Sequence, residues 1–571
     1  MGSMSIAQIP PKSQAIVTRN RFDIRKWGML IALVQVDPSP PTGSGFTDTD
    51  WLVLIAYFLT LAITGYLLSR KTNQTTEDYF LGSRQMPPWA VAISIVATSL
   101  SAVTFISVPE SAYLGDLTYL ATNIGMILAA IIIAFVFLPA FYRSHSASIY
   151  ELLETRFGAP SRKAASTTFM IGRVLASGAR IYAGAIPASI LLFGLDKGTD
   201  PENLIIAIAI LTTVGIGYTL AGGISSVIWS DVIQFGILIG AALVAILLIT
   251  GSFTVPISQI ITELQTGGSE GSSKLTLFDL SLDPRQSFSL PACIIGFTLL
   301  GVGSYGTDQD LAQRMLTCQS AKAGARSIIT GILLAIPTVS IFLIVGLFLW
   351  IVYQRPELTT LTGESPTGDS VKVFLHYIMT QIPPGVRGLM MAGLFAAGLS
   401  SLNSAINAMG AAFIADLYRP MVTAKNPNIP ERHFVFVGRL AVVGWGIILG
   451  LFAIVCIFWK NSNNETLINF ALGVMGIAYA GLIGVFFTAL FTKRGSTRSV
   501  IAALVVGFVW MIATQRFLYD AIPALHTPRI EYFYDIHFTW KLTIGVIFTT
   551  IICMLGNRPN QDTDRAAPQA A

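Results

Sequence analysis

Residues 88–112 read PWAVAISIVATSLSAVTFISVPESA, an apolar run long enough to cross a bilayer that is studded with hydroxyl side chains and contains Pro109. Hydroxyls and an internal proline loosen a helix. A second run, beginning at residue 289, is loosened in the same way by Gly301, Gly303, Ser304, Gly306, Thr307 and Asp308. We predict that both helices are broken. They lie five predicted spans apart, and interrupted helices at matching positions of two halves are typical of membrane folds built as inverted repeats.

The composition places the whole chain in a bilayer. Of its 571 residues, 53% are hydrophobic and 12% are charged, against roughly 25% charged residues in soluble domains. About thirteen spans are expected, near residues 50–69, 88–112, 117–141, 165–194, 203–221, 225–250, 289–306, 327–353, 385–416, 434–459, 466–491, 499–518 and 540–556. The predicted fold is an all-α polytopic membrane protein with two five-helix repeats of opposite topology, at about 88–250 and 289–491.

The distribution of charged residues predicts the orientation of the chain in the membrane. The net charge of +5 is small for this length and favours no nucleic-acid partner. If the N terminus lies outside, the inner loops hold about eighteen basic residues and the outer loops about seven. This imbalance predicts a multi-pass protein of the cell membrane with an outside N terminus and a cytoplasmic C terminus. We expect a disordered tail at 1–48, one membrane domain at 49–557 and a short cytoplasmic tail at 558–571. The long outer loops at 251–288 and 354–384 are candidate lids.

Polar groups gather in two apolar segments. Residues 396–407 read AAGLSSLNSAIN, in which Ser400, Ser404 and Asn407 share one helical face. Such hydroxyls, together with carbonyls freed where a helix unwinds, suit a hard cation such as Na⁺. Asp231 follows a Gly-Gly pair at the start of another span. An intramembrane carboxylate suggests an ion or proton site, although a helix cap near the interface is also compatible.

The sequence around Asp231 resembles a known family. The run Trp229-Ser230-Asp231-Val232-Ile233-Gln234 is similar to the signature of the sodium:solute symporter family, which includes sodium/galactose, sodium/proline and sodium/sialic acid carriers. The stretches at 76–82 and 88–90, Gln313-Arg314 and Ser400-Ser401 agree, so the likeness covers roughly residues 50–500. The resemblance implies a LeuT-like fold and sodium-coupled symport of a small polar organic solute by alternating access.

The resemblance also implies sodium ligands. The primary Na⁺ would be held by the backbone carbonyls of Ala97, Leu100 and Ala397 and by the hydroxyls of Ser400 and Ser401. Some members bind a second Na⁺, which here would involve Asp231, Ser400 and Ser404. Asn403 stands where those members carry Ser or Thr, and its amide oxygen can still coordinate a cation.

The sequence says less about the transported solute than about the ion. Candidate substrate-binding residues are Ser99, Ser101, Thr104, Asn123, Arg180, Ser304 and Tyr305. Arg180 resembles an arginine of the proline carriers and either binds a carboxylate or snorkels to the outer interface. The sugar-binding set of the galactose carriers is largely absent, with leucines at 333 and 472. Two classes of solute are compatible with these residues: a small carboxylate, including sialic acid or an amino acid, and a sugar. The missing sugar contacts favour the carboxylate.

Other classes find less support. The five histidines are scattered without zinc spacing, and no nucleophile and base recur together, so we do not expect an enzyme. A proton-coupled carrier of the same fold is an alternative, as is a transporter-like membrane sensor, for which no cytoplasmic signalling domain is expected. The expected partners are Na⁺, a small-molecule solute and the lipid bilayer, and we expect a monomer to suffice for transport.

Overall fold

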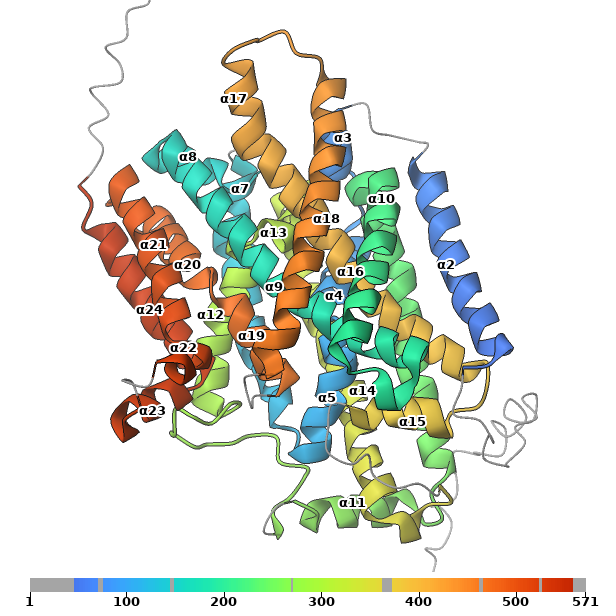
Figure 1. Cartoon of the computed structure of the whole chain (residues 1–571). Helices are drawn as coiled ribbons and strands as arrows, with labels where there is room; N and C mark the ends of the chain where they lie inside the picture. The colour runs from blue at the N-terminus through green and yellow to red at the C-terminus, as the bar shows by residue number, and fades with distance from the viewer. Residues whose placement is uncertain are drawn as a thin grey trace, which may run out of the picture. The chain divides into compact units, whose positions relative to one another are not determined.

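The computed structural model describes residues 46–69, 75–143, 148–268, 271–361, 372–461, 466–522 and 526–557. These residues form helices and connecting loops, with isolated β-bridges only. The predicted tails at 1–48 and 558–571 lie almost entirely outside the described residues. The all-helical class is therefore confirmed for the described chain (Figure 1).

The first predicted break lies where the hydroxyl-rich run suggested. Helix α4 (Pro88–Ser99) and helix α5 (Ala102–Leu114) meet at an angle of 64°. Leu100 and Ser101 between them are extended, with ψ angles of 126° and −178°. Ser101 then caps α5 through a reciprocal capping box with Thr104. The cap stabilises a new helix start inside the span, so the interruption is built into the sequence.

The second predicted break is also present. A π-helical segment η6 (Ala292–Gly296), α12 (Phe297–Val302) and a second π-helical segment η7 (Gly303–Thr307) form one span. Asp308 is extended, and α13 (Gln309–Leu316) follows. The Asp308 side chain caps α13 by accepting from the amide of Asp310 at 2.9 Å. Both repeats thus begin with a discontinuous helix, as an inverted repeat requires.

A single glycine separates two further predicted spans. Helix α10 (Pro201–Gly251) covers both and is interrupted at Gly223, whose φ and ψ are 60° and −169°. A Cβ atom at this position would lie 2.6 Å from the carbonyl oxygen of Tyr79. Only glycine combines this backbone conformation with such a close approach. This break lies between the spans predicted near 203–221 and 225–250.

The other spans also match helices. They are α2 (Asp48–Ser69), η3 (Thr118–Ala121) with α6 (Thr122–Ile132), η4 (Ile133–Phe137) and α7 (Leu138–Arg143), α9 (Ala159–Lys197), α14 (Ala321–Gln354), α16 (Val386–Ala412) with η10 (Phe413–Tyr418) and α17 (Arg419–Thr423), α18 (Glu431–Asn461), α19 (Leu467–Gly476) with α20 (Tyr479–Phe491), α21 (Thr497–Ala513) and α24 (Phe538–Met554). Among the described residues, seven helices are long and apolar enough to cross a membrane, two bent pairs qualify together, and four shorter apolar helices lie at the remaining predicted positions.

Short helices lie in the loops. They are α3 (Thr76–Leu81), η2 (Gly82–Arg84), α8 (Glu151–Phe157), α11 (Ile257–Thr266), η8 (Pro356–Leu358), α15 (Val373–Gln381), α22 (Arg516–Ala521) and α23 (Pro528–Asp535). The candidate lids contain α11 and α15, which lie at one end of the bundle (Figure 1). Lys274 fixes the first lid to the end of α5, since its Nζ donates to the carbonyls of Tyr113 at 3.1 Å and Gly115 at 2.6 Å.

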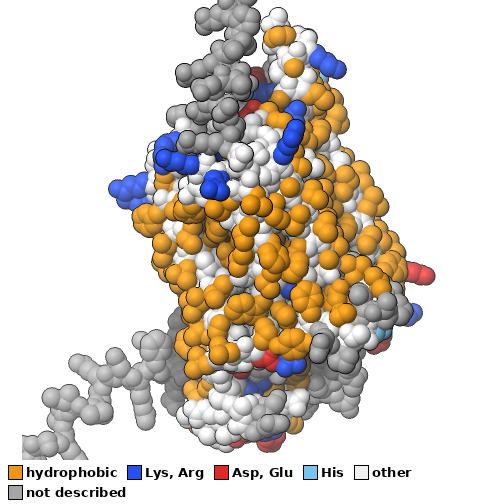
Figure 2. Space-filling view, turned by 90° about the vertical axis from the view of Figure 1, so that its left-hand side faces the viewer, with side chains coloured by type: hydrophobic (Ala, Val, Ile, Leu, Met, Phe, Trp, Pro, Cys, Tyr) orange, Lys and Arg blue, Asp and Glu red, His pale blue; other side chains and the backbone are white. Residues whose placement is uncertain are grey.

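The surface is that of a membrane protein. Hydrophobic side chains spread over the face formed by α21 and α24, while Lys and Arg gather toward its ends (Figure 2). Ile547 and Ile551 on α24, and Leu555 directly after it, are 52%, 51% and 74% exposed, which fits lipid rather than water. Helix α16 is almost completely buried and packs against α10, α9, α18, α2 and α4. Its side chains therefore line the interior.

Candidate functional site

The break between α4 and α5 lies against the middle of α16. The Cβ that could be added to Gly398 on α16 would meet Ala102, the first residue of α5, at 3.9 Å. The hydroxyl of Ser401 donates to the carbonyl oxygen of Thr98 at 3.3 Å. These contacts bring the predicted sodium ligands of the two spans to one crossing.

Backbone oxygens are available at this crossing. In a continuous helix the amide of Ser101 would bond to the carbonyl of Ala97, but here it donates to Thr104 Oγ1 at 3.3 Å. The extended residues Leu100 and Ser101 likewise interrupt helical pairing for the carbonyls at the end of α4, whereas the Ser101 carbonyl accepts from the amide of Phe105 at 3.2 Å. Ala97, Leu100, Ala397 and Ser401 are each 3–5% exposed. Neutral, water-poor oxygens of this kind fit an alkali cation.

Ser400 belongs to a different cluster from its neighbour. Its hydroxyl donates to Asp231 Oδ1 at 2.6 Å. Asp231 Oδ2 accepts from Ser94 at 2.5 Å and pairs with Arg314 at 3.1 Å. Asp231 and Arg314 are both fully buried. The carboxylate that the sequence suggested as an ion ligand is thus neutralised by a guanidinium, which joins α10 to α13.

Arg314 connects this carboxylate to a second one. Its Nη1 pairs with Asp310 at 2.8 Å and donates to Ser404 Oγ at 2.7 Å, and Ser404 also donates to Asp310. Of the residues suggested for a second sodium site, the structure therefore brings Asp231 and Ser400 together and places Ser404 across Arg314 from them. The role of Arg314 was missed, although an Asp-Arg pair four residues apart beside a broken span was the available signal.

The network continues toward α9. Arg173 pairs with Asp308 and, at 3.3 Å, with Asp310. The hydroxyl of Tyr479 donates to Asp308 Oδ2 at 2.8 Å. Together with Asp231 and Arg314, three buried acids face two buried arginines. Such pairing is needed because an unpaired charge is costly to bury.

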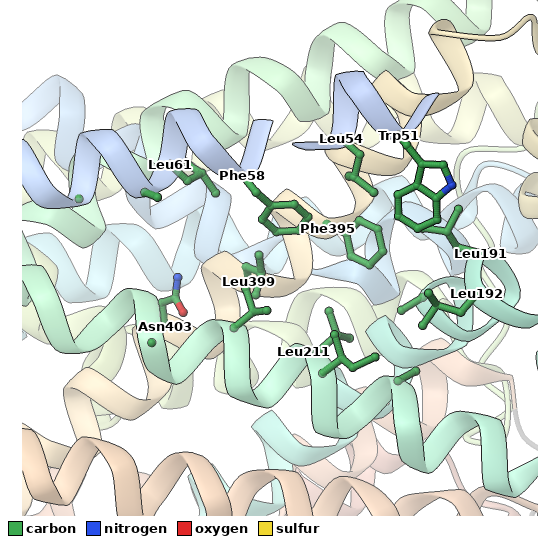
Figure 3. A pocket seen from close by; sticks show the side chains of 17 residues that line it. Trp51, Leu54, Phe58, Leu61, Leu191, Leu192, Leu211, Phe395, Leu399 and Asn403 are labelled. Carbon is green, nitrogen blue, oxygen red and sulfur yellow. The ribbon is translucent and has the colours of Figure 1, made fainter. Parts of the chain in front are cut away.

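Asn403 lies elsewhere. It lines an apolar groove between α2, α9, α10 and α16, and its Oδ1 is buried without a hydrogen-bond partner among the described residues (Figure 3). The structure does not show it with the Asp231 cluster.

The substrate candidates form two groups. Arg180 donates to the Thr98 carbonyl at 3.4 Å and contacts Met475 Sδ at 3.2 Å, and no carboxylate of the described residues pairs with it. Ser99 shares a hydrogen bond of 3.1 Å with Tyr305. Arg180, Ser99 and Tyr305 therefore gather around the end of α4, next to the point where it meets α16.

The other candidates have local partners. Ser101 and Thr104 cap α5, and Asn123 Nδ2 donates to the carbonyl of Leu120 at 3.0 Å. Ser304 is 8% exposed on η7, beside Tyr305. Leu333, which the sequence argument placed in the pocket, is 54% exposed and does not help to close a buried site.

The comparison with protein families decides the identity of this arrangement. A model described as the sodium:solute symporter family matches residues 79–507. The chain belongs to the sodium:solute symporter family. This symporter is 31% identical over 480 residues to the sodium/sialic acid symporter SiaT of Proteus mirabilis, covering 82% of the chain and 90% of that protein. The predicted family resemblance is confirmed.

Two further comparisons extend this result. The symporter is 27% identical over 537 residues to sodium-coupled monocarboxylate transporter 1 of Mus musculus, covering 91% of the chain and 83% of that protein. The solved structure of a substrate-bound, outward-open Na⁺-coupled sialic acid symporter matches with a TM-score of 0.72 and 27% identity, covering 90% of the chain and 98% of that structure.

Family membership confirms that the chain is an integral membrane transporter and not an enzyme. It also confirms the LeuT-like fold class that the family resemblance implied, and the two broken helices agree with it. Across the described residues there is no group of three or more His, Cys, Asp or Glu side chains arranged to hold a metal ion. A sodium site made of carbonyls and hydroxyls needs no such group.

Proposed function

We propose that this protein carries a small organic carboxylate into the cell together with Na⁺. Na⁺ would bind at the crossing of α4, α5 and α16, through the carbonyls of Ala97, Leu100 and Ala397 and the hydroxyl of Ser401. Ser400 would join them only by giving up the hydrogen bond that it donates to Asp231. The carboxylate would bind beside it at Arg180, with Ser99 and Tyr305 supplying hydrogen bonds. Ser101, Thr104, Asn123 and Ser304 complete the set of candidate solute contacts.

One observation carries this proposal. The carbonyl of Thr98 accepts from the hydroxyl of Ser401, at 3.3 Å, and from the guanidinium of Arg180, at 3.4 Å, so a proposed ion ligand and a proposed solute ligand share one oxygen. Arg180 is half-buried and has no described acidic partner. A guanidinium with unused donors suits a carboxylate, which it can bind in a bidentate manner. Among the proteins compared above, the named solutes are sialic acid and monocarboxylates, which are carboxylates.

The shared carbonyl supplies a route for coupling. A bound Na⁺ would orient the end of α4, and that end carries Thr98 and Ser99 beside the solute position. Each ligand then raises the affinity of the other by the same factor. Moving one Na⁺ across a potential of 100 mV contributes ~2.3 kcal/mol to accumulation.

The same proposal assigns an orientation. The face of α11 and α15 would be outside, and the C terminus would be cytoplasmic, in accord with the excess of basic residues in the opposite loops. A monomer holds every residue of the proposed site.

The second sodium position is a separate proposal. It would use Asp231, Ser400 and Ser404, with Asn403 only after its side chain reorients. A cation there must share Asp231 with Arg314, which lies 3.1 Å away. The ratio of charge moved to solute transported in proteoliposomes distinguishes one Na⁺ per cycle from two.

The experiment that tests the main proposal is Arg180→Gln. Purified protein would be assayed for thermal stabilisation by Na⁺ and by a panel of monocarboxylates, sialic acids, amino acids and sugars. The variant should keep its stabilisation by Na⁺ and lose sodium-dependent stabilisation by the carboxylate. Arg285→Gln, in an exposed loop arginine, is the matched control.

Two results would contradict the proposal. If Arg180→Gln retains full affinity for the carboxylate, Arg180 is not its ligand. If solute binding in the parent protein follows pH and is unaffected by replacing Na⁺ with choline, the carrier is coupled to protons.

A further inference from the structure

A groove between four helices of the bundle opens at the apolar surface. It is a groove of about 480 Å³ between α2, α9, α10 and α16, a volume typical of a small-molecule site. Its walls are stripes at helical spacing, for example Leu54, Phe58 and Leu61 on α2. The floor is α16, with Phe395, Leu399 and Asn403 one turn apart (Figure 3).

The groove is open and long. Its margin includes Leu192, Ile210 and Val214, which are 40%, 46% and 38% exposed. Lining residues on α2 run from Trp51 to Gly65, which is about 21 Å along a helix. An apolar groove of this length, opening from the hydrocarbon region, matches an extended hydrocarbon chain.

One polar group interrupts the apolar lining. Asn403 is 1% exposed, and its Oδ1 has no hydrogen-bond partner in the described chain. Apart from Trp51, it is the only lining residue with a polar side chain. It lies at the opposite end of the groove from Trp51 (Figure 3). A buried amide oxygen without a partner is costly, so a ligand that satisfies it gains affinity there.

We propose that this groove binds a single-chain, membrane-soluble molecule that bears a hydroxyl group, with the hydroxyl at Asn403 and the chain running toward Trp51. A hydroxyl both donates and accepts, so it pairs with the Asn403 amide in either orientation of that amide. Asn403 is two residues from Ser401 and three from Ser400 on the same helix. The occupant would therefore touch the helix that carries the proposed ion ligands, from the side facing lipid.

The proposal goes beyond the transport function, and its test measures binding alone. The probe is a long-chain primary alcohol carrying a photoreactive diazirine on its chain. After illumination with the full-length protein in detergent, mass spectrometry of the peptides should find the label on α2 and on residues 201–217 of α10.

Glycine positions provide a filling variant with a matched control. Gly217 lines the groove, and a Cβ added there meets nothing within 4 Å. Gly217→Leu should fill the groove and lower labelling of α2 at least about fivefold, which corresponds to a loss of roughly 1 kcal/mol of binding free energy. Gly240 on the same helix is equally open but lies outside the groove. Gly240→Leu should leave labelling unchanged.

The hydroxyl is tested separately. Asn403→Leu should reduce labelling by the alcohol probe to the level of a diazirine-bearing alkane of the same length, while the alkane labels both proteins equally. Preference of the unsubstituted protein for the alcohol is expected to be about fivefold.

Three outcomes would overturn the proposal. They are equal labelling of Gly217→Leu and Gly240→Leu, labelling spread evenly over all lipid-facing helices, and no preference for the alcohol over the alkane. Because none of these readouts involves Na⁺ or uptake, a failed transport proposal would leave them unaffected.

Discussion

Adjacent serines on α16 are predicted to behave differently when each is changed to alanine. Ser401 faces the Thr98 carbonyl at the proposed sodium crossing, at 3.3 Å. Ser400 donates to the Asp231 carboxylate, at 2.6 Å. Ser401→Ala removes one of about five oxygens around the ion. A hydrogen-bonding partner of a charged group contributes about 1.5–3 kcal/mol, so the affinity for Na⁺ should fall roughly 10- to 150-fold.

Ser400→Ala provides the matched comparison. It deletes an atom of the same kind one residue away, and it leaves the buried Asp231 with one fewer donor. We expect this variant to lose about 1–3 kcal/mol of stability and to lose more thermal stability in the absence of Na⁺ than Ser401→Ala does.

The assay is the sodium titration of thermal stability on purified protein, repeated as sodium-dependent uptake in proteoliposomes. Ser401→Ala should shift the half-maximal sodium concentration and keep its melting temperature without sodium. An unchanged sodium midpoint in both assays would remove Ser401 from the ion site. An equal loss of sodium affinity in both variants, with equal stability, would refute the separation of roles.

Three other perturbations follow from the same contacts. Asp231→Asn should lower the free energy of unfolding by about 3 kcal/mol or more because it leaves Arg314 short of a counter-charge. Adding Arg314→Met to this variant should restore part of the lost stability if the two residues are coupled, and additive losses would argue against the pair. Gly223→Ala should cost at least about 1–3 kcal/mol through its backbone conformation, whereas Gly236→Ala, with open space around it, should be nearly neutral in a melting assay. Burial lowers the pKa of Lys274 from 10.5 to about 8, an effect that Asp116 partly opposes. The folded protein therefore releases this proton at a lower pH than the unfolded chain, and its free energy of unfolding should rise between pH 8 and 10 relative to that of Lys274→Met. A stability difference between the two proteins that does not vary with pH would contradict this.

The architecture could be predicted because the bilayer leaves few choices. Helices are the spanning solution for an apolar chain of this composition. Residues that cannot continue a helix then mark its breaks, as Ser101 and Gly223 do. One limit of a span coincides with such a residue. Gly194, where one predicted span ends, is the point at which α9 kinks, with a φ of 84°.

The site was less accessible to sequence reasoning because its contacts join distant segments. Arg314 pairs with Asp231, which is 83 positions away, and no local spacing reveals this contact. Asn403 was assigned by position to an ion site, yet its side chain lines the groove. Helical periodicity predicts the direction of a side chain around its helix only to within about one residue. Which side chains then meet depends on how the neighbouring helices pack.

The charges in the bundle bear on the choice of solute. Asp231, Asp308 and Asp310 are paired with Arg173 and Arg314. Arg180 brings the sum of these six charges to zero, and it lies at the end of α4 without an acid in contact. Na⁺ arriving at the crossing adds positive charge beside this guanidinium, and like charges in a low dielectric repel strongly. A neutral sugar would leave that repulsion in place. A carboxylate placed between Arg180 and the ion would offset it, so ion and solute each lower the cost of binding the other. On electrostatic grounds, the arrangement therefore favours an anionic solute and couples its binding to that of sodium.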